Sequence, residues 1–251
     1  MSGRLSGRTA VITGASRGLG KAMALALAAE GASIALVARD REQLHKTAEE
    51  VWRTGSGAQI FPVDLTSEEG VRQLEKDVTL EFGKVHILIN NAGINIRKPI
   101  TEFALEEWRR VIDTNLTSTF LMCRSFVPHM KGNGYGRIIN LASTMAHVSI
   151  AARTAYSASK AAILGLTRAL ALELAPEAIT VNSISPGPFA TEMNTALIQN
   201  PEVNAQFIAK IPVGRWGQVG EVGQLAVYLC SPDAGFITGA DVLIDGGWCA
   251  Q

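Results

Sequence analysis

The sequence alternates short apolar runs with longer segments of helical pattern along its whole length. Seven runs of five or six residues are apolar or β-branched, at 9–13, 33–38, 59–64, 86–90, 137–142, 180–185 and 241–245. Helical patterns lie between them at 18–30, 41–54, 67–82, 104–129, 156–175 and 219–230. Strands buried on both faces have such continuous apolar runs, and parallel strands need a crossover helix. The alternation therefore predicts an α/β fold with a doubly wound, mostly parallel seven-stranded sheet and helices on both faces.

The composition favours a globular protein that binds small molecules. No proline- or glycine-rich linker and no repeat divides the chain, so we expect a single domain over residues 1–251. Hydrophobic residues make up 47% of the sequence, with no apolar run long enough to cross a bilayer. Basic and acidic residues number 23 each, so no general field attracts nucleic acid or an anionic membrane. We expect a small-molecule substrate, no nucleic acid and no membrane partner.

The cysteines and the start of the chain favour a cytoplasmic protein. Cys123, Cys230 and Cys249 are widely spaced and odd in number, which suits reduced thiols better than a disulfide framework. The first residues lack an apolar signal core with a small-residue cleavage site. The four histidines have no ligand spacing with one another or with cysteine, so we predict no metal.

A glycine-rich segment, "TGASRGLG", follows the first predicted strand and leads into a helix. Its glycines, Gly14, Gly18 and Gly20, permit a tight turn and a close backbone approach to a pyrophosphate bound at the helix N-terminus. The spacing is G-x-x-x-G-x-G rather than the general dinucleotide fingerprint G-x-G-x-x-G. By itself the segment could also be an ordinary strand–helix turn capped by Ser16.

Further chemistry-bearing residues follow later strands. "NNAG" (90–93) follows the fourth predicted strand, Ser143 the fifth and "PGPFAT" (186–191) the sixth. Tyr156 and Lys160 are four residues apart on one face of a predicted helix, where a phenol and an ammonium can reach the same cleft. Ligands of such sheets bind at the carboxyl ends of the strands. Each segment alone can be loop chemistry, but together they predict one site.

In their order and spacing these segments resemble the short-chain dehydrogenase/reductase family. The matching motifs are T-G-x-x-x-G-x-G, N-N-A-G, a serine, Y-x-x-x-K and P-G, and the resemblance covers essentially the whole chain. It implies a Rossmann fold and an oxidoreductase that interconverts a ketone and a secondary alcohol with a nicotinamide cofactor. The catalytic residues it implies are Asn115, Ser143, Tyr156 and Lys160.

Reduction of a carbonyl needs a proton on oxygen as hydride reaches carbon, which assigns a role to each of these residues. Tyr156 would shuttle the proton, and the Lys160 cation would favour its phenolate by lowering its pKa. Ser143 would hydrogen-bond the substrate oxygen and polarise it. By resemblance, Lys160 also holds the nicotinamide ribose, and Asn115 holds a water in a proton relay toward the lysine.

The end of the second predicted strand favours NADP(H) over NAD. The family resemblance places aspartate at Ala38 in NAD-dependent relatives and arginine at Arg39 in NADP-dependent ones. Arg17 offers a second cation for a 2′-phosphate, and Asp40 is the residue that would favour NAD instead. Asp64 matches the residue that contacts the adenine ring, and Thr191 the one that bonds the carboxamide. The complete predicted cofactor set is Gly14, Ser16, Arg17, Gly18, Leu19, Gly20, Arg39, Asp64, Leu65, Asn90, Ala92, Gly93, Tyr156, Lys160, Pro186, Gly187, Phe189 and Thr191.

The substrate prediction depends on a lid over about residues 188–217, with the cofactor half at about 1–150. The segment after Pro-Gly resembles gluconate 5-dehydrogenases, and similar segments occur in 3-oxoacyl-carrier-protein reductases. A sugar acid such as 5-keto-gluconate needs a cation for its carboxylate, for which Arg97, His147 and Arg153 are candidates. If two converge, an anionic substrate is expected; if none does, a neutral or acyl ketone is. The remaining predicted substrate contacts are Met145 and Met193, with Phe189 and Trp216 as further apolar candidates.

Two other features complete the predictions. A regulator that binds a dinucleotide without turnover is the alternative of another class, disfavoured because it would not need all four catalytic residues. Helix 104–129 carries one apolar stripe at helical spacing and further apolar residues on other faces, so a second surface must cover it. In this family that helix and the tyrosine-bearing helix form a subunit interface, so we predict a homotetramer. The stripe consists of Leu105, Trp108, Ile112, Leu116, Phe120, Cys123 and Val127.

Overall fold

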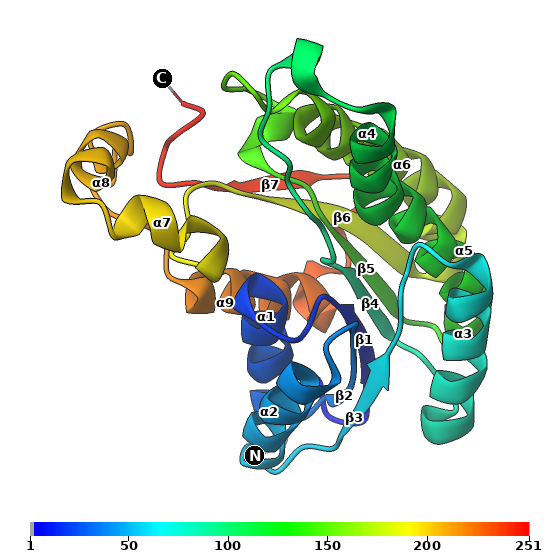
Figure 1. The fold of residues 1–251 in the computed structure, drawn as a ribbon. Coiled ribbons are helices and arrows are strands. Elements are labelled where there is room, and N and C mark those ends of the chain that lie inside the picture. Colours follow the sequence, from blue (N-terminus) through cyan, green and yellow to red (C-terminus); the bar gives the residue numbers. More distant parts are fainter. Residues whose placement is uncertain (1–2, 251) are drawn as a thin grey trace.

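A computed structural model describes residues 3–250 and contains one seven-stranded sheet (Figure 1). The strands are β1 Thr9–Thr13, β2 Ser33–Ala38, β3 Ala58–Pro62, β4 Ile87–Asn90, β5 Gly136–Leu141, β6 Ile179–Pro186 and β7 Asp241–Ile244. Their order is β3-β2-β1-β4-β5-β6-β7, and every adjacent pair is parallel. The doubly wound α/β fold is confirmed, and the sheet is parallel throughout rather than mostly.

The strand order reverses direction beside β1, and this reversal determines where a ligand site can form. From β1 the chain runs outward to β3, then returns to β4 on the other side of β1. Such a reversal leaves a crevice at the carboxyl ends of the two strands beside it, β1 and β4. The glycine-rich segment and "NNAG" follow these two strands.

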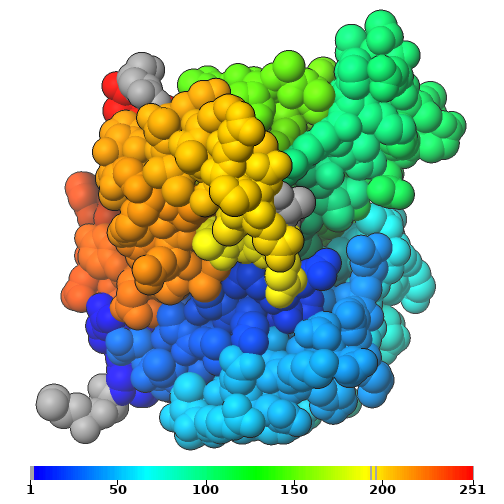
Figure 2. Space-filling model, turned by 60° about the vertical axis from the view of Figure 1, so that its left-hand side comes forward, coloured from blue at the N-terminus to red at the C-terminus, as the bar shows by residue number. Residues whose placement is uncertain are grey.

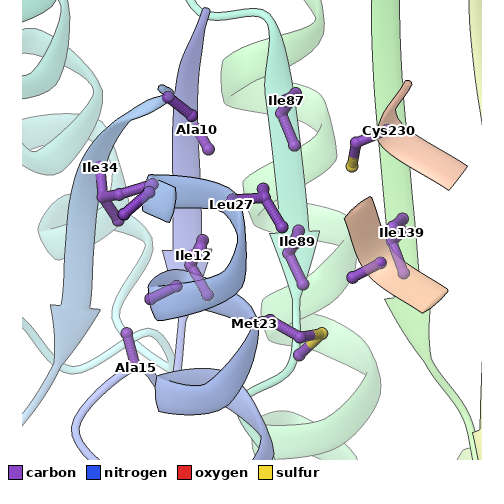
Figure 3. Packing of buried hydrophobic residues seen from close by; sticks show 14 of the residues in the cluster. Ala10, Ile12, Ala15, Met23, Leu27, Ile34, Ile87, Ile89, Ile139 and Cys230 are labelled. Atoms are coloured by element: carbon purple, nitrogen blue, oxygen red, sulfur yellow. The ribbon is translucent and has the colours of Figure 1, made fainter. Parts of the chain in front are cut away.

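Each face of the sheet buries its own apolar core because successive side chains of a strand point to opposite faces. In β1, Ile12 packs into the cluster with Met23 and Leu27 of α1 (Gly18–Ala29) (Figure 3), whereas Val11 packs into the other cluster. Helices α2 (Arg41–Trp52) and α9 (Val219–Cys230) cover the first face with α1. Helices α3 (Glu68–Phe82), α5 (Ser118–Met130) and α6 (Thr154–Leu174) cover the second.

The helix predicted over 104–129 is interrupted. It forms α4 (Leu105–Ile112), a π-helical turn at Asp113–Thr117, and α5. The turn inserts an extra residue and rotates the following face by about 100°. Consequently the predicted stripe does not form one buried face. Leu105 and Phe120 are exposed, whereas Leu121, Met122 and Phe126 are buried.

The predicted lid contains two short helices, α7 (Thr195–Ile198) and α8 (Pro201–Ile208), between β6 and α9. In Figure 2 this yellow and orange segment lies over the blue N-terminal half and faces the green residues near 100. Its inner side is held by aromatic stacking: Phe207 of α8 lies 4.9 Å from Trp216 and 5.2 Å from Trp248 between ring centroids.

Candidate active site

A cavity of about 840 Å³ opens at the carboxyl ends of the strands and is bordered by the lid. It brings together segments that are far apart in the sequence, from the glycine-rich turn to the C-terminal Trp248. The predicted site residues that line it are Gly14, Ser16, Arg17, Gly18, Leu19, Arg39, Asp64, Leu65, Ala92, Gly93, Arg97, Ser143, Met145, Arg153, Tyr156, Lys160, Pro186, Gly187, Phe189 and Thr191.

The glycine-rich turn is fixed by close packing against the end of β4. Gly14 has φ +64°, a left-handed conformation that favours glycine, and a Cβ there would lie 2.6 Å from Asn91 Nδ2. The Asn91 amide donates to Thr13 O and Gly14 O at 2.9 and 3.2 Å. Gly20 lies under the turn, where a Cβ would be 2.3 Å from Gly14 O. It does not line the cavity, so its predicted cofactor contact becomes a packing role.

Asn90 also lies off the cavity. Only 4% exposed, it donates to Asn140 Oδ1 at 2.9 Å and ties β4 to β5 below the site. Its Oδ1 is buried without a partner. The prediction that Asn90 contacts the cofactor is therefore corrected: its neighbour Asn91 lines the cavity instead.

Tyr156 and Ser143 face each other at the centre of the site. Burial raises the pKa of Tyr156, whereas a hydrogen bond with Ser143 and the charges of Arg153 and Arg97 act to lower it. Ser143 Oγ also accepts from Met145 N–H at 3.1 Å, which leaves its own proton free to be donated. At neutral pH the phenol therefore carries its proton, as a proton donor for reduction must.

Lys160 lies close to the Tyr156 ring, as their spacing on one helix face predicts. Its Nζ lies 5.8 Å from the Tyr156 ring centroid and donates to Leu141 O. Burial lowers the pKa of Lys160 to about 8. Among the charges that act to lower the pKa of Tyr156 are those of Arg153 and Arg97, and the effect expected of Lys160 on the phenol stays a prediction.

Asn115 stabilises the backbone beside the site through its hydrogen bonds. It lies in the π-helical turn, is 1% exposed and does not line the cavity. Its Oδ1 accepts from Ile94 N–H at 2.8 Å, and its Nδ2 donates to Ile94 O and Ser159 Oγ, both at 3.0 Å. The side chain thereby joins the segment after "NNAG" to α6, and its predicted part in a water relay stays a prediction.

Two of the three predicted carboxylate-binding cations converge. Lys98 N–H donates to Ala152 O at 3.2 Å, and this backbone contact brings the preceding Arg97 toward the following Arg153. Burial lowers the pKa of Arg153, the charge of Arg97 lowers it further, and Tyr156 acts in the opposite direction. Neither arginine forms an ion pair with another described residue.

His147, the third candidate, is not part of this pair. Its Nε2 lies 2.6 Å from Asp241 Oδ2, and it does not line the cavity. The prediction that it receives a substrate carboxylate is therefore corrected, because Asp241 already occupies it. The side chain of Met193 lies outside the described part of the structure.

The end of the cavity beside β2 contains the two charged residues that bear on the choice between NADP(H) and NAD, Arg39 and Asp40. Asp40 is the N-cap of α2, and its Oδ1 accepts from Gln43 N–H at 3.1 Å. Arg39 is exposed beside the cavity and close enough to Asp64 to lower its pKa, although the hydrogen bonds from Thr66 contribute more. Arg17 lies 3.4 Å from Glu192 of the lid in an exposed ion pair.

Several lining residues were not predicted from the sequence. Asn95 lines the cavity with its Oδ1 buried and without a partner, and Phe207 and Trp248 add aromatic surface. Only the doublet in "NNAG" offered a signal, for Asn91; the others come from loops and from helix α8, whose positions over the cavity the sequence does not specify. Further unpredicted lining residues are Arg110, Thr114, Ile150 and Asn194. Trp216 is not among the lining residues and supports the cavity indirectly through Phe207.

The described residues, 3–250, contain neither a cluster of metal ligands nor a helix that could span a membrane. Within this range no group of three or more His, Cys, Asp or Glu side chains is placed to hold a metal ion. None of the helices found there combines the length and the apolar character needed to cross a bilayer.

The fold and the cavity at the carboxyl ends of its strands define the class of a Rossmann-type oxidoreductase. A family model described as enoyl-(acyl carrier protein) reductase matches residues 14–249. The chain belongs to the short-chain dehydrogenase/reductase family, whose members use a nicotinamide cofactor and act on hydroxyl and keto groups.

Relatives of different specificity are similarly close to this chain. It is 36% identical to a 3-oxoacyl-[acyl-carrier-protein] reductase of Vibrio cholerae, over 97% of this chain and 98% of that protein. It is 35% identical to a gluconate 5-dehydrogenase of Gluconobacter oxydans, over 97% of this chain and 95% of that protein. A solved structure from Agrobacterium tumefaciens, provisionally named 2-deoxy-D-gluconate 3-dehydrogenase and holding bound NADP, is 34% identical with TM-score 0.91 over 98% of both chains. Identity alone therefore does not distinguish sugar acids from acyl thioesters.

Proposed function

We propose that this enzyme interconverts a keto acid and its secondary alcohol with NADP(H), and that the substrate is a sugar acid such as 5-keto-gluconate. The observation that carries the proposal is that Arg97 and Arg153 line the same cavity as Tyr156, with the charges of both arginines acting on the Tyr156 hydroxyl. Two guanidinium groups without carboxylate partners among the described residues repel each other, and a bound carboxylate would relieve that repulsion. A neutral ketone would leave them unpaired.

The cavity fits a nicotinamide dinucleotide. At Gly14 a side chain would collide with Asn91, and at Gly93 a Cβ would lie 3.3 Å from Asn115 Oδ1 and 3.6 Å from Lys160 Nζ. Glycine at both positions lets the glycine-rich turn and the segment after β4 pack closely together at the cavity, where a pyrophosphate and a ribose would bind. Arg39 supports NADP(H), since Asp40 uses its carboxylate as a helix cap and Ala38 carries no charge. The bound NADP of the Agrobacterium relative supports the same choice.

In the proposed reaction the protein positions the carbonyl and supplies the proton. Ser143 donates a hydrogen bond to the carbonyl oxygen, and the Tyr156 hydroxyl gives that oxygen its proton as the alcohol forms. A bound nicotinamide supplies or accepts the hydride. Lys160 would hold the ribose hydroxyls, Asp64 the adenine ring and Thr191 the carboxamide, as the family resemblance implies. Gly14, Gly18 and the helix α1 N-terminus would hold the pyrophosphate.

A 3-oxoacyl thioester is the second candidate substrate. Met145, Ile150, Phe207 and Trp248 give the cavity an apolar side along which an acyl chain could lie. In that case Arg97 and Arg153 would contact the anionic carrier rather than a substrate carboxylate.

The proposal extends to domain organisation, assembly and location. Residues 1–251 would form one domain, with the cofactor half at about 1–150 and the lid at about 188–217. The apolar surface left exposed on α4, α5 and α6, including Leu105, Phe120 and Leu172, supports a homotetramer. The three cysteines are free thiols, which supports a cytoplasmic location.

The testing experiment follows NADPH oxidation by the purified protein with 5-keto-D-gluconate and with an acetoacetyl thioester, using NADH as the control cofactor. We expect turnover of the keto acid with NADPH. Arg97→Ala and Arg153→Ala should each raise the KM for the keto acid by about tenfold or more, because a hydrogen bond to a charged group is lost. Turnover of the thioester alone would assign acyl reduction, and a preference for NADH would refute the role of Arg39.

A further inference from the structure

The loop after Ser143 contributes residues to the cavity wall both before and after His147, which does not line the cavity. Thr144, Met145 and Ile150 face the cavity, whereas His147, between them, binds Asp241 of β7. The loop is tied at a second point, where Ser149 Oγ lies 2.8 Å from Ser157 Oγ of α6. We name the segment of residues 144–150 the substrate loop.

Asp241 connects the substrate loop to the strand that leads into the Pro-Gly segment. Its Oδ1 accepts from Ser183 Oγ at 2.6 Å and from Ser185 Oγ at 2.9 Å, and its Oδ2 accepts from Ser185 Oγ at 2.8 Å. Both serines belong to β6 and are fully buried. Ser185 directly precedes Pro186 and Gly187, which line the cavity. One carboxylate therefore holds His147 on one side and the end of β6 on the other.

We propose that His147 and Asp241 are positioning residues that set the substrate loop against the end of β6 and thereby determine how tightly the carbonyl substrate binds. Neither needs to touch the substrate. A hydrogen bond to a carboxylate that two buried serines already fix has little freedom to shift, so it defines the place of the loop. The inference extends the proposed function and depends on it only for the kinetic test.

The alternative is a hydrogen-bonded pair that contributes to stability alone, and the chain contains a matched control for it. His129 Nε2 lies 2.6 Å from Glu75 Oε1, the same separation as in the His147–Asp241 pair. The side chains are 31% and 28% exposed, against 33% and 16% for His147 and Asp241. The control pair joins α5 to α3, and neither member lines the cavity.

The experiment measures steady-state kinetics of His147→Ala, Asp241→Ala, the double variant and His129→Ala, with 5-keto-D-gluconate and NADPH. His147→Ala should raise the KM for the keto acid by about tenfold, the scale of one charge-assisted hydrogen bond, while kcat and the KM for NADPH change less than about twofold. Asp241→Ala should raise the KM for the keto acid at least as much, because it also releases Ser183 and Ser185. The double variant should be no worse than Asp241→Ala, because His147 acts on the loop only through Asp241. His147→Gln, which retains a donor, should recover part of the loss, and His129→Ala should change no kinetic constant.

A second measurement remains informative even if the keto acid is not a substrate. Amide hydrogen exchange of residues 144–150 should be faster in His147→Ala and Asp241→Ala and unchanged in His129→Ala. Absence of turnover by the wild type would refute the proposed substrate and leave this measurement valid. Unchanged exchange in the loop would refute the positioning role. Additive kinetic effects in the double variant, or an equal KM change in His129→Ala, would do so as well.

Discussion

At the scale of single residues, burial controls the proton chemistry of the site. It keeps the proton on Tyr156 by raising its pKa, and it lowers the pKa of Lys160 to about 8 because an ammonium loses its hydration. Sequence reasoning placed the two groups on one helix face but could not include the cost of burying each charge. Burial therefore raises the pKa of the Tyr156 phenol and lowers that of the Lys160 ammonium, which the spacing of the two residues does not reveal.

Replacing Tyr156 with Phe should separate catalysis from cofactor binding. The substitution removes the hydroxyl proposed as the proton donor and leaves the ring in place. We expect kcat to fall by about 10² to 10⁴, the usual contribution of a positioned acid, with the Kd for NADPH nearly unchanged. Stopped-flow turnover and fluorescence titration of NADPH measure the two quantities. Near-native turnover in this variant would exclude the assigned proton donor, and wild-type protein that binds NADPH without any turnover would favour a regulator.

The buried Lys160 should give the protein a stability that rises with pH. Its pKa is about 8 in the folded protein against an ordinary value of 10.5, so between these values the unfolded chain binds more protons. Unfolding then becomes less favourable as pH rises through this window. Relative to Lys160→Met, the wild type should gain about 3 kcal/mol in free energy of unfolding between pH 7 and pH 10.5. Urea unfolding of both proteins across this range checks the difference, and a constant gap between them would contradict the buried cation.

At the scale of helices and strands, sequence reasoning succeeds where burial on both faces leaves a simple signal. All seven strands lie where the apolar runs predicted them, with ends shifted by at most two residues, because most of these runs consist of apolar or β-branched residues that a buried sheet favours. It fails at the π-helical turn of Asp113–Thr117, because one inserted residue changes the helix face without changing the composition. The site residues likewise divide into those that the sequence places correctly and those that it does not. Residues adjacent to strand ends reach the cavity, whereas His147 and Asn90 are withdrawn by partners far along the chain, Asp241 and Asn140.

Asp40 provides a prediction at this scale because its side chain caps α2. Asp40→Ala should reduce the free energy of unfolding by about 1 kcal/mol, the usual value of an N-cap, without changing the preference between NADPH and NADH. Arg39→Ala should do the opposite, leaving stability nearly unchanged and weakening NADPH by about tenfold or more. Thermal unfolding and the two cofactor KM values separate the effects. If Asp40→Ala instead altered the cofactor preference, its carboxylate would have to face the ribose.

At the scale of the whole molecule, the helices of one face retain apolar side chains that the single chain does not cover. Leu105 of α4, Phe120 of α5 and Leu172 of α6 are 55%, 45% and 81% exposed. These helices lie on the same side of the sheet in Figure 1. The π-helical turn contributes to this surface, because it turns Phe120 outward while the following residues enter the core.

The proposed homotetramer should therefore dissociate when charges are placed on this face. In Phe120→Glu/Leu172→Glu, two carboxylates would have to lose their water at the subunit contact, at a cost of several kcal/mol. We expect light scattering coupled to size-exclusion chromatography to give a tetramer for the wild type and a dimer or monomer for this variant, with unchanged circular dichroism because both side chains are exposed in the isolated fold. Leu80→Glu is the matched control, since Leu80 of α3 is 89% exposed outside the proposed interface. If the double variant is still a tetramer, the subunit contacts lie elsewhere. If the wild type is a monomer, the apolar face does not mediate self-association.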